Sequence, residues 1–259
     1  MTTPAASWMV RMRPRSGARL RLLCVPYAGV GPSAYRRWAQ DLPADIEVGV
    51  LHLPGRESRL REAPLTRIEP LIDAAAPALR AYLDLPFAMF GHSMGALVAF
   101  ELTRRFQEEG WGTPTHLFIS GRRAPDLPPR HPAITHLPDD EFVSEIRRRY
   151  NGIPDEVLRH PDLLALLLPG LRADLSVIET YAHRSGPPLG CPIAAFGGLA
   201  DPEATEAELV AWRPHTTSAL SVQMFPGGHF FLQSAHEDLM RILTDELMTP
   251  SDGAFGARA

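Results

Sequence analysis

The chain has 259 residues, a net charge of −4 and 22% charged residues. This composition excludes wholesale disorder, and the negative charge gives no global attraction to nucleic acid or to an anionic membrane. All 26 basic residues are arginine, which excludes a Schiff-base lysine and a P-loop lysine. At about 150 residues per domain, the length predicts one large domain or one domain with an insertion.

Several further classes of protein are disfavoured because the sequence lacks their characteristic patterns. The two cysteines, Cys24 and Cys191, lie far apart in apolar stretches, which argues against a disulfide framework and a thiolate metal site. His131 and His136 do not have metal-ligand spacing, so no metal is expected. The chain has neither the apolar core of a signal peptide nor a run of about 18 apolar residues. We therefore expect a cytoplasmic monomer without a nucleic-acid or membrane partner.

Apolar runs and helical patterns alternate through the first half of the chain. The apolar runs are short enough for buried strands, and the amphipathic segments between them have helical periodicity. This β-α-β-α order predicts a parallel sheet that is covered by helices. The predicted strands are residues 20–26, 46–53, 87–90 and 116–120, and the predicted helices are residues 33–42, 66–85 and 94–109.

The alternation stops near Pro125, and residues 126–183 contain no convincing strand. The predicted fold is therefore an α/β core, residues 1–125 and 184–259, with a helical insertion at 126–183. Residues rich in Pro, Gly, Ser and Ala predict loose ends at 1–18 and 249–259. The elements predicted after Pro125 are helices at 139–150 and 156–181, strands at 192–196 and 220–225 with a helix between them, and a last helix at 231–248.

The strongest motif is G-H-S-M-G at residues 91–95. It follows the predicted strand 87–90 directly and leads into the predicted helix 94–109. Two glycines permit the sharp strand-to-helix turn that exposes a nucleophilic serine, here Ser93. The alternative is a glycine turn with an incidental serine.

A serine nucleophile needs a base that is oriented by a carboxylate, in the chain order Ser, Asp, His for this architecture. Asp201 follows the predicted strand 192–196, and His229 follows the predicted strand 220–225. Because carboxyl ends of parallel strands meet at one sheet edge, we expect both to approach Ser93. Asp201 and His229 are therefore the candidate orienting acid and general base. The rivals lie in predicted helices or in the insertion: Asp174, Asp238 and His236.

Residues 29–34 fit the loose dinucleotide pattern G-x-G-x-x-A, but the rest of the fingerprint is missing. The pattern expects an acid at the end of the second strand to bind the ribose. Here Asp45 and Glu47 lie at the start of that strand, and Pro32 interrupts the motif. Nucleotide binding is therefore disfavoured.

The same loop admits a second interpretation as part of an oxyanion hole. Its glycines let the backbone approach a substrate closely. One backbone N–H from this loop would then act together with the N–H of Met94, the residue after the serine. Ala28 is the candidate donor in the loop.

Arginines after the strand 116–120 and on the helix 139–150 are candidates for contact with an acidic partner. The alternative is that they form an ordinary solvated surface. The arginines concerned are Arg122, Arg123 and Arg130 in the first group, and Arg147, Arg148 and Arg149 in the second.

These motifs together resemble the stand-alone type II thioesterases of polyketide and nonribosomal peptide pathways. The serine elbow alone is unspecific, but its combination with the other motifs is specific. The resemblance runs from about residue 20 to residue 247. The motifs that carry it are PYAG at residues 26–29, Trp38, LPGRE at 53–57, GHSMGA at 91–96 and GHFFL at 228–232.

The resemblance implies an α/β-hydrolase fold with a helical lid. No cofactor is expected, because the protein itself supplies the nucleophile, the base and the oxyanion donors. It implies cleavage of acyl thioesters from the phosphopantetheine arm of acyl or peptidyl carrier proteins, which clears stalled or misprimed assembly lines. It assigns Ser93, Asp201 and His229 as the triad, with the oxyanion N–H groups on Ala28 and Met94. One departure is Val30, where the family usually has a second glycine.

Two alternative functions are also compatible with these motifs. A carboxylesterase or lipase of the same fold would use the same triad. A non-catalytic scaffold that binds carrier proteins would have no need for all three triad residues.

Overall fold

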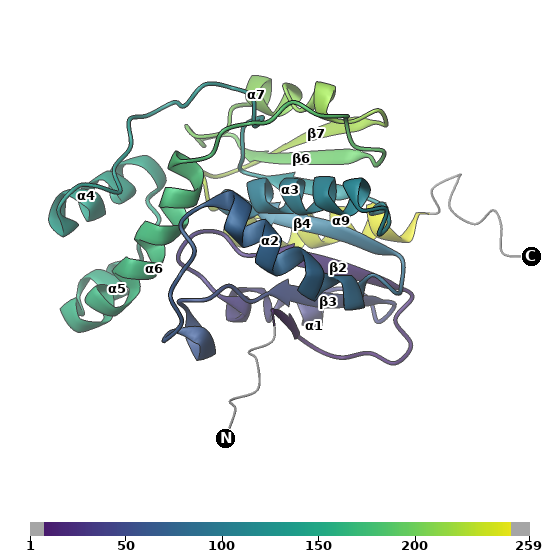
Figure 1. The fold of residues 1–259 in the computed structure, drawn as a ribbon, viewed down its shortest axis with the longest axis horizontal. Helices are drawn as coiled ribbons and strands as arrows, with labels where there is room; N and C mark the ends of the chain where they lie inside the picture. Colours follow the sequence, from purple (N-terminus) through teal and green to yellow (C-terminus); the bar gives the residue numbers. More distant parts are fainter. Residues whose placement is uncertain (1–7, 250–259) are drawn as a thin grey trace, which may run out of the picture.

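The computed structural model describes residues 8–249, in which seven strands form one sheet of order β1-β3-β2-β4-β5-β6-β7 (Figure 1). Strands β2 to β7 run parallel. The most buried of them are nearly continuous apolar runs, as expected for a sheet that is covered on both faces. The parallel strands are β2 (Leu20–Val25), β3 (Ile46–Leu51), β4 (Phe87–His92), β5 (Leu117–Ser120), β6 (Ile193–Gly198) and β7 (Leu220–Phe225).

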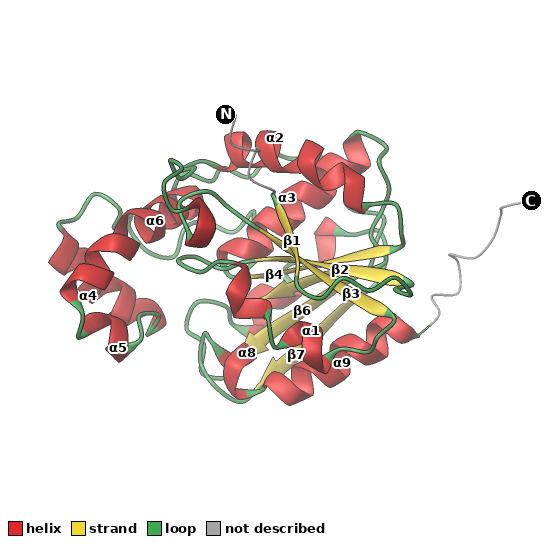
Figure 2. Ribbon diagram, turned by 90° about the horizontal axis from the view of Figure 1, so that it is seen from below, coloured by secondary structure: helices red, strands yellow, loops and turns green. Residues whose placement is uncertain are grey.

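Helices cover both faces of the sheet and create two apolar layers. Leu23 and Met89 belong to the layer under α2 and α3, whereas Cys24 and Phe90 belong to the layer against α1 and α9. Figure 2 shows these helix pairs on opposite sides of the strands. Among residues 8–249, no helix is both long and apolar enough to cross a bilayer. The bounds are α1 (Trp38–Asp41), α2 (Ile68–Leu79), α3 (Met94–Glu108) and α9 (His236–Met248).

Short helical elements complete the core, and several of them divide longer predicted helices. The predicted helix 33–42 is two short pieces, and the helix 66–85 ends in a separate turn after Pro77. The last predicted helix is interrupted at Ala235. These elements are η1 (Pro32–Tyr35), η2 (Glu57–Arg59), η3 (Arg80–Tyr82), α7 (Glu206–Val210), η4 (Arg213–His215) and α8 (Phe231–Ser234).

The insertion between β5 and β6 consists of α4 (Asp139–Tyr150), α5 (Asp155–Leu158) and α6 (Pro161–Glu179). It lies beyond one end of the sheet (Figures 1 and 2). The predicted helix 156–181 is two helices because Pro161 starts a new one at its first turn, where proline's missing N–H costs nothing. The insertion has its own apolar cluster: Ile134, Phe142, Ile146, Ile153, Leu168 and Leu175.

The expectation of a loose segment at residues 1–18 is wrong for part of that range. Strand β1 (Met9–Arg11) pairs antiparallel with the outer side of β3. The buried carboxylate of Glu47 on β3 binds the guanidinium of Arg11 and accepts the backbone N–H of Arg15. A three-residue edge strand is too short to show alternation, so sequence periodicity missed it. Residues 1–7 and 250–259 lie outside the described residues.

The sheet core generates a stability prediction at Phe118 on β5. This ring is fully buried and stacks on Phe196 of the next strand, with ring centroids 5.9 Å apart. Phe118→Ala should lower the free energy of unfolding by about 3–5 kcal/mol, because the large cavity left behind cannot collapse. Leu199→Ala, at a side chain that is 69% exposed, should change it by less than about 0.5 kcal/mol. Equal midpoints in urea denaturation of the two variants would contradict this account.

Candidate active site

Ser93 lies at the sharp turn between β4 and α3, in a backbone conformation that side chains rarely adopt (φ 53°, ψ −117°). The turn is possible because two glycines allow very close backbone contacts. A Cβ at Gly91 would lie 2.1 Å from the carbonyl oxygen of Gly95, and a Cβ at Gly95 would lie 2.2 Å from that of Val25. The strained turn therefore holds the Ser93 hydroxyl at the carboxyl edge of the sheet.

Three side chains from separate strand ends meet at this point. The Nε2 of His229 lies 3.0 Å from the Oγ of Ser93, and its Nδ1 lies 2.9 Å from the Oδ2 of Asp201. The side chains of His229 and Asp201 are 3% and 0% exposed. Because an ionised carboxylate only accepts, Nδ1 carries the proton and Nε2 is left to accept one from Ser93. This arrangement suits a serine nucleophile, a general base and an orienting acid.

The rival acids and the rival histidine lie elsewhere. Asp174 pairs with Arg56, and His236 pairs with Asp41 on the far side of the sheet. Asp238 pairs with Arg241 on the surface of α9.

His92, next to the serine, belongs to the site although the sequence motif does not indicate a role for it. It is fully buried, its Nδ1 lies 2.9 Å from the Oγ of Ser120, and its ring centroid lies 4.9 Å from that of His229. Burial, together with the nearby His229, holds the pKa of His92 well below its usual value. His92 is therefore a neutral ring that packs against the base without adding charge beside it.

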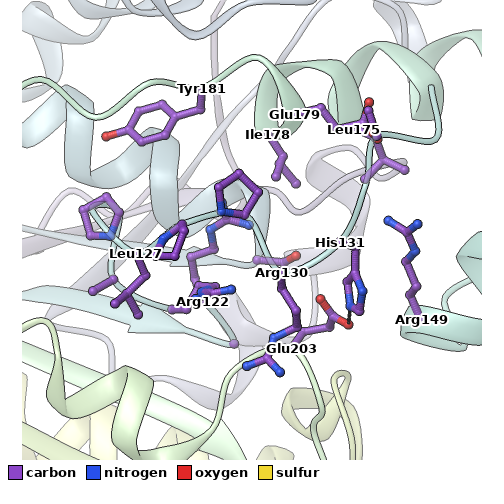
Figure 3. Close-up of a pocket in the computed structure, with 18 of the residues that line it drawn as sticks. Arg122, Leu127, Arg130, His131, Arg149, Leu175, Ile178, Glu179, Tyr181 and Glu203 are labelled. Carbon is purple, nitrogen blue, oxygen red and sulfur yellow. Dashed lines mark hydrogen bonds and ion pairs between the residues drawn. The ribbon is translucent and has the colours of Figure 1, made fainter. Parts of the chain in front are cut away.

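A cavity of about 650 Å³ opens beside Ser93 and His229. Figure 3 shows its two walls: Ile178 and Tyr181 come from the end of α6 and the segment after it, opposite the loop that carries Arg122 and Leu127. This volume is in the range of small-molecule sites, about 300–1,000 Å³. The site can therefore hold a substrate chain next to the serine hydroxyl.

A second, smaller hollow of about 30 Å³ lies next to Ser93 and is mainly apolar. Tyr150, the last residue of α4, lines it with its ring centroid 5.2 Å from that of His229. Burial raises the pKa of Tyr150 to about 12, so its hydroxyl stays protonated at neutral pH. No sequence spacing linked Tyr150 to the site, because only the docking of the insertion brings it there.

The loop after β2 borders the same small hollow. Ala28 lines it together with Ser93. Gly29 has a φ of +82°, and its N–H donates to Asp174 at 2.8 Å. Val30 keeps a negative φ, so a side chain is tolerated where the family usually has glycine. The N–H of Met94 belongs to the first turn of α3, whose N–H groups have no preceding helical carbonyl to bind.

The geometry of residues 29–34 leaves no phosphate cradle. The carboxylate of Glu57 accepts the N–H and the hydroxyl of Ser33, at 3.0 and 2.6 Å. A Cβ at Gly31 would lie 2.5 Å from the same carboxylate. An acid therefore occupies the space that a pyrophosphate would need and would repel it. Residues 8–249 also contain no cluster of three His, Cys, Asp or Glu side chains that could hold a metal ion.

Most of the arginines considered for partner contact are paired with acids. Arg122, which also lines the cavity, differs: within residues 8–249 it forms no ion pair, and its buried Nε has no hydrogen-bond partner there. Burial lowers the pKa of its guanidinium. The paired arginines are Arg123 and Arg130 with Glu208, Arg148 and Arg149 with Glu145, and Arg147 more loosely with Asp155 at 3.8 Å.

Comparison with known proteins places this site in a family. The model of the thioesterase domain matches residues 20–247. The chain is 42% identical over 240 residues to the gramicidin S biosynthesis protein GrsT of Aneurinibacillus migulanus, covering 93% of each chain. It is 41% identical over 245 residues, with the same coverage, to the linear gramicidin dehydrogenase LgrE of Brevibacillus parabrevis. Despite that relative's name, the loop of residues 29–34 has the geometry described above, which is unsuited to a dinucleotide.

A solved structure agrees with the sequence relatives. The type II thioesterase BorB from the borrelidin biosynthetic cluster has a TM-score of 0.86 and 36% identity, covering 95% of this chain and 100% of that one. Together with the sheet order and the serine elbow, these matches confirm the predicted fold and family. The chain belongs to the type II thioesterases, enzymes of the α/β-hydrolase fold that hydrolyse thioesters.

Proposed function

We propose that this thioesterase removes acyl groups from the phosphopantetheine arm of carrier proteins and so clears stalled or misprimed polyketide or nonribosomal peptide assembly lines. The observation that carries the proposal is the hydrogen-bonded chain from Ser93 through His229 to Asp201 beside a cavity of about 650 Å³. The relatives named for gramicidin and borrelidin biosynthesis supply the assembly-line context.

In the proposed mechanism, the Ser93 Oγ attacks the thioester carbonyl carbon while His229 Nε2 takes the hydroxyl proton. The oxyanion of the tetrahedral intermediate accepts the N–H groups of Ala28 and Met94. Collapse breaks the C–S bond, and His229 returns the proton to the pantetheine sulfur. A water molecule, deprotonated by His229, then attacks the acyl-enzyme, which releases the carboxylic acid and restores Ser93. Asp201 holds the histidine tautomer throughout.

The insertion, residues 126–183, is the proposed lid over the core of residues 1–125 and 184–259. It lies over the carboxyl edge of the sheet and supplies most of the cavity lining, with Leu127 and Ile178 on opposite walls (Figures 1 and 3). Its helices share an apolar cluster, which supports movement as a unit, and Val177 of α6 packs in the core.

Arg122 would donate hydrogen bonds to carbonyl oxygens of the substrate. In the described part of the chain it is the cavity arginine that pairs with no acid, whereas Arg123, Arg130 and Arg149 each do.

Ser93→Ala tests the nucleophile. The variant should lose turnover by a factor on the order of 10⁶ in kcat, because removing a triad nucleophile removes the covalent route. Its melting temperature should match that of the parent protein. Ser218→Ala, at a serine before β7 on the opposite edge of the sheet, should keep full turnover. Retention of more than roughly a tenth of turnover by Ser93→Ala would rule the mechanism out.

A substrate panel tests the carrier-protein assignment. We expect kcat/KM to be highest for acyl-carrier proteins, lower for acyl-N-acetylcysteamine thioesters and lowest for p-nitrophenyl esters, because remote binding energy from the carrier lowers the barrier. A preference for the small esters would indicate a general esterase. Turnover of none of them would indicate a scaffold.

Hydrogen exchange tests the lid. Amides of α4 and α5 should exchange faster than those of β4 and β5, because lids open by local motions that the central strands do not make. Mass spectrometry of peptides from residues 139–158 and 87–120 provides the comparison. Equally slow exchange in both regions would indicate a rigid cap.

A further inference from the structure

The motif at residues 53–57, part of the family resemblance, has no task in the mechanism above. Its arginine, Arg56, forms a bidentate ion pair with Asp174 of α6. The Nη2 lies 2.7 Å from Oδ1 and the Nη1 lies 2.8 Å from Oδ2. Arg56 is 7% exposed and Asp174 is 1% exposed. Removing both charges from water costs about as much free energy as their attraction returns, so a gain in stability does not by itself explain this buried pair.

Both members of the pair also hold the loop that carries Ala28. The same Oδ2 of Asp174 accepts the N–H of Gly29 at 2.8 Å. Arg56 donates to the carbonyl of Val30 at 3.3 Å. The peptide group between Ala28 and Gly29 is therefore held by a carboxylate, and the one between Val30 and Gly31 by a guanidinium. Because Asp174 takes the N–H of Gly29, that group is committed, and the N–H of Ala28 is left for an oxyanion.

Two neighbouring contacts restrict the loop further. The carboxylate of Glu57, next to Arg56, binds Ser33 at the far end of the loop. Leu171, one turn before Asp174 on α6, packs so closely on Gly29 that a Cβ there would lie 3.1 Å from its Cδ1. The loop is thus held from the motif on one side and from the insertion on the other.

We propose that Arg56 and Asp174 are positioning residues that aim the N–H of Ala28 at the oxyanion. Asp174 belongs to the insertion, whereas Arg56 and Ala28 belong to the core. The oxyanion hole is therefore complete only when α6 is docked, which couples lid closure to catalysis. This inference rests on the proposed triad mechanism and adds the residues that orient one of its donors.

The test uses two variants of the pair. Asp174→Asn leaves Arg56 without its anion. The double variant Arg56→Met/Asp174→Leu replaces both charges with apolar side chains of similar size, which folded proteins often tolerate well. In both variants kcat for an acyl-N-acetylcysteamine thioester should fall by about 10- to 100-fold, somewhat less than the loss of about 10²–10³ for deleting an oxyanion donor. KM should change little, because the donor acts in the transition state.

A second readout separates positioning from a merely structural role. An acyl trifluoromethyl ketone forms a tetrahedral oxyanion adduct with the serine, so its affinity should fall by the same factor as kcat. The pH midpoints of kcat/KM should stay those of the parent, since the triad is unchanged. Full kcat in a folded double variant, or a loss of kcat with unchanged affinity for the ketone, would overturn the inference.

Glu47→Gln is the matched control. Glu47 is also 1% exposed and also binds arginine together with a backbone N–H, but at the opposite end of the sheet. It should alter stability without altering kcat or the affinity for the ketone. Ser93→Ala, measured in parallel, separates the two claims. An inactive Ser93→Ala with a fully active Asp174→Asn would refute the positioning role alone, whereas an active Ser93→Ala would refute the mechanism itself.

Discussion

The site depends on one close backbone approach, the contact between the ends of β2 and β4 and the first turn of α3. Gly91 and Gly95 have no side chains, so strand and helix come within distances that any Cβ would prevent. That approach forces Ser93 into its positive-φ conformation and places its hydroxyl at the rim of the sheet. The surrounding parallel strands are buried on both faces, and their packing maintains the strained backbone of Ser93.

The parallel sheet also positions the two residues that form the hydrogen-bonded chain with Ser93. Asp201 and His229 lie in the loops after β6 and β7, at the same edge as Ser93. Two buried rings pack on His229 and add no charge beside it, because burial lowers the pKa of His92 and raises that of Tyr150. Burial of this kind strengthens each charge interaction that develops in the transition state.

The insertion packs both on itself and on the core. Its helices share an apolar cluster, while α6 also reaches the core through Val177, Asp174 and Leu171. The insertion meets the core at both parts of the site: Asp174 and Leu171 contact the loop of Ala28, and Tyr150 packs against His229. A movement of α6 would break the contacts of Asp174 and Leu171 with that loop. The proposed lid can in this way link the binding of substrate to readiness for chemistry.

Features that depend on local pattern and chain order could be predicted from the sequence. Alternating apolar runs and helical periods predicted the parallel strands, and glycine spacing predicted the elbow at Ser93. The edge positions of Asp201 and His229 followed because parallel strands all end on one side. Tertiary structure alone decided the rest. Strand β1 exists because β3 offers an unpaired edge and Glu47 offers a buried charge to Arg11. Asp174, 118 residues from Arg56, became its partner only through packing of the insertion. No local signal encodes such a contact, because its energy arises only when distant segments are desolvated together.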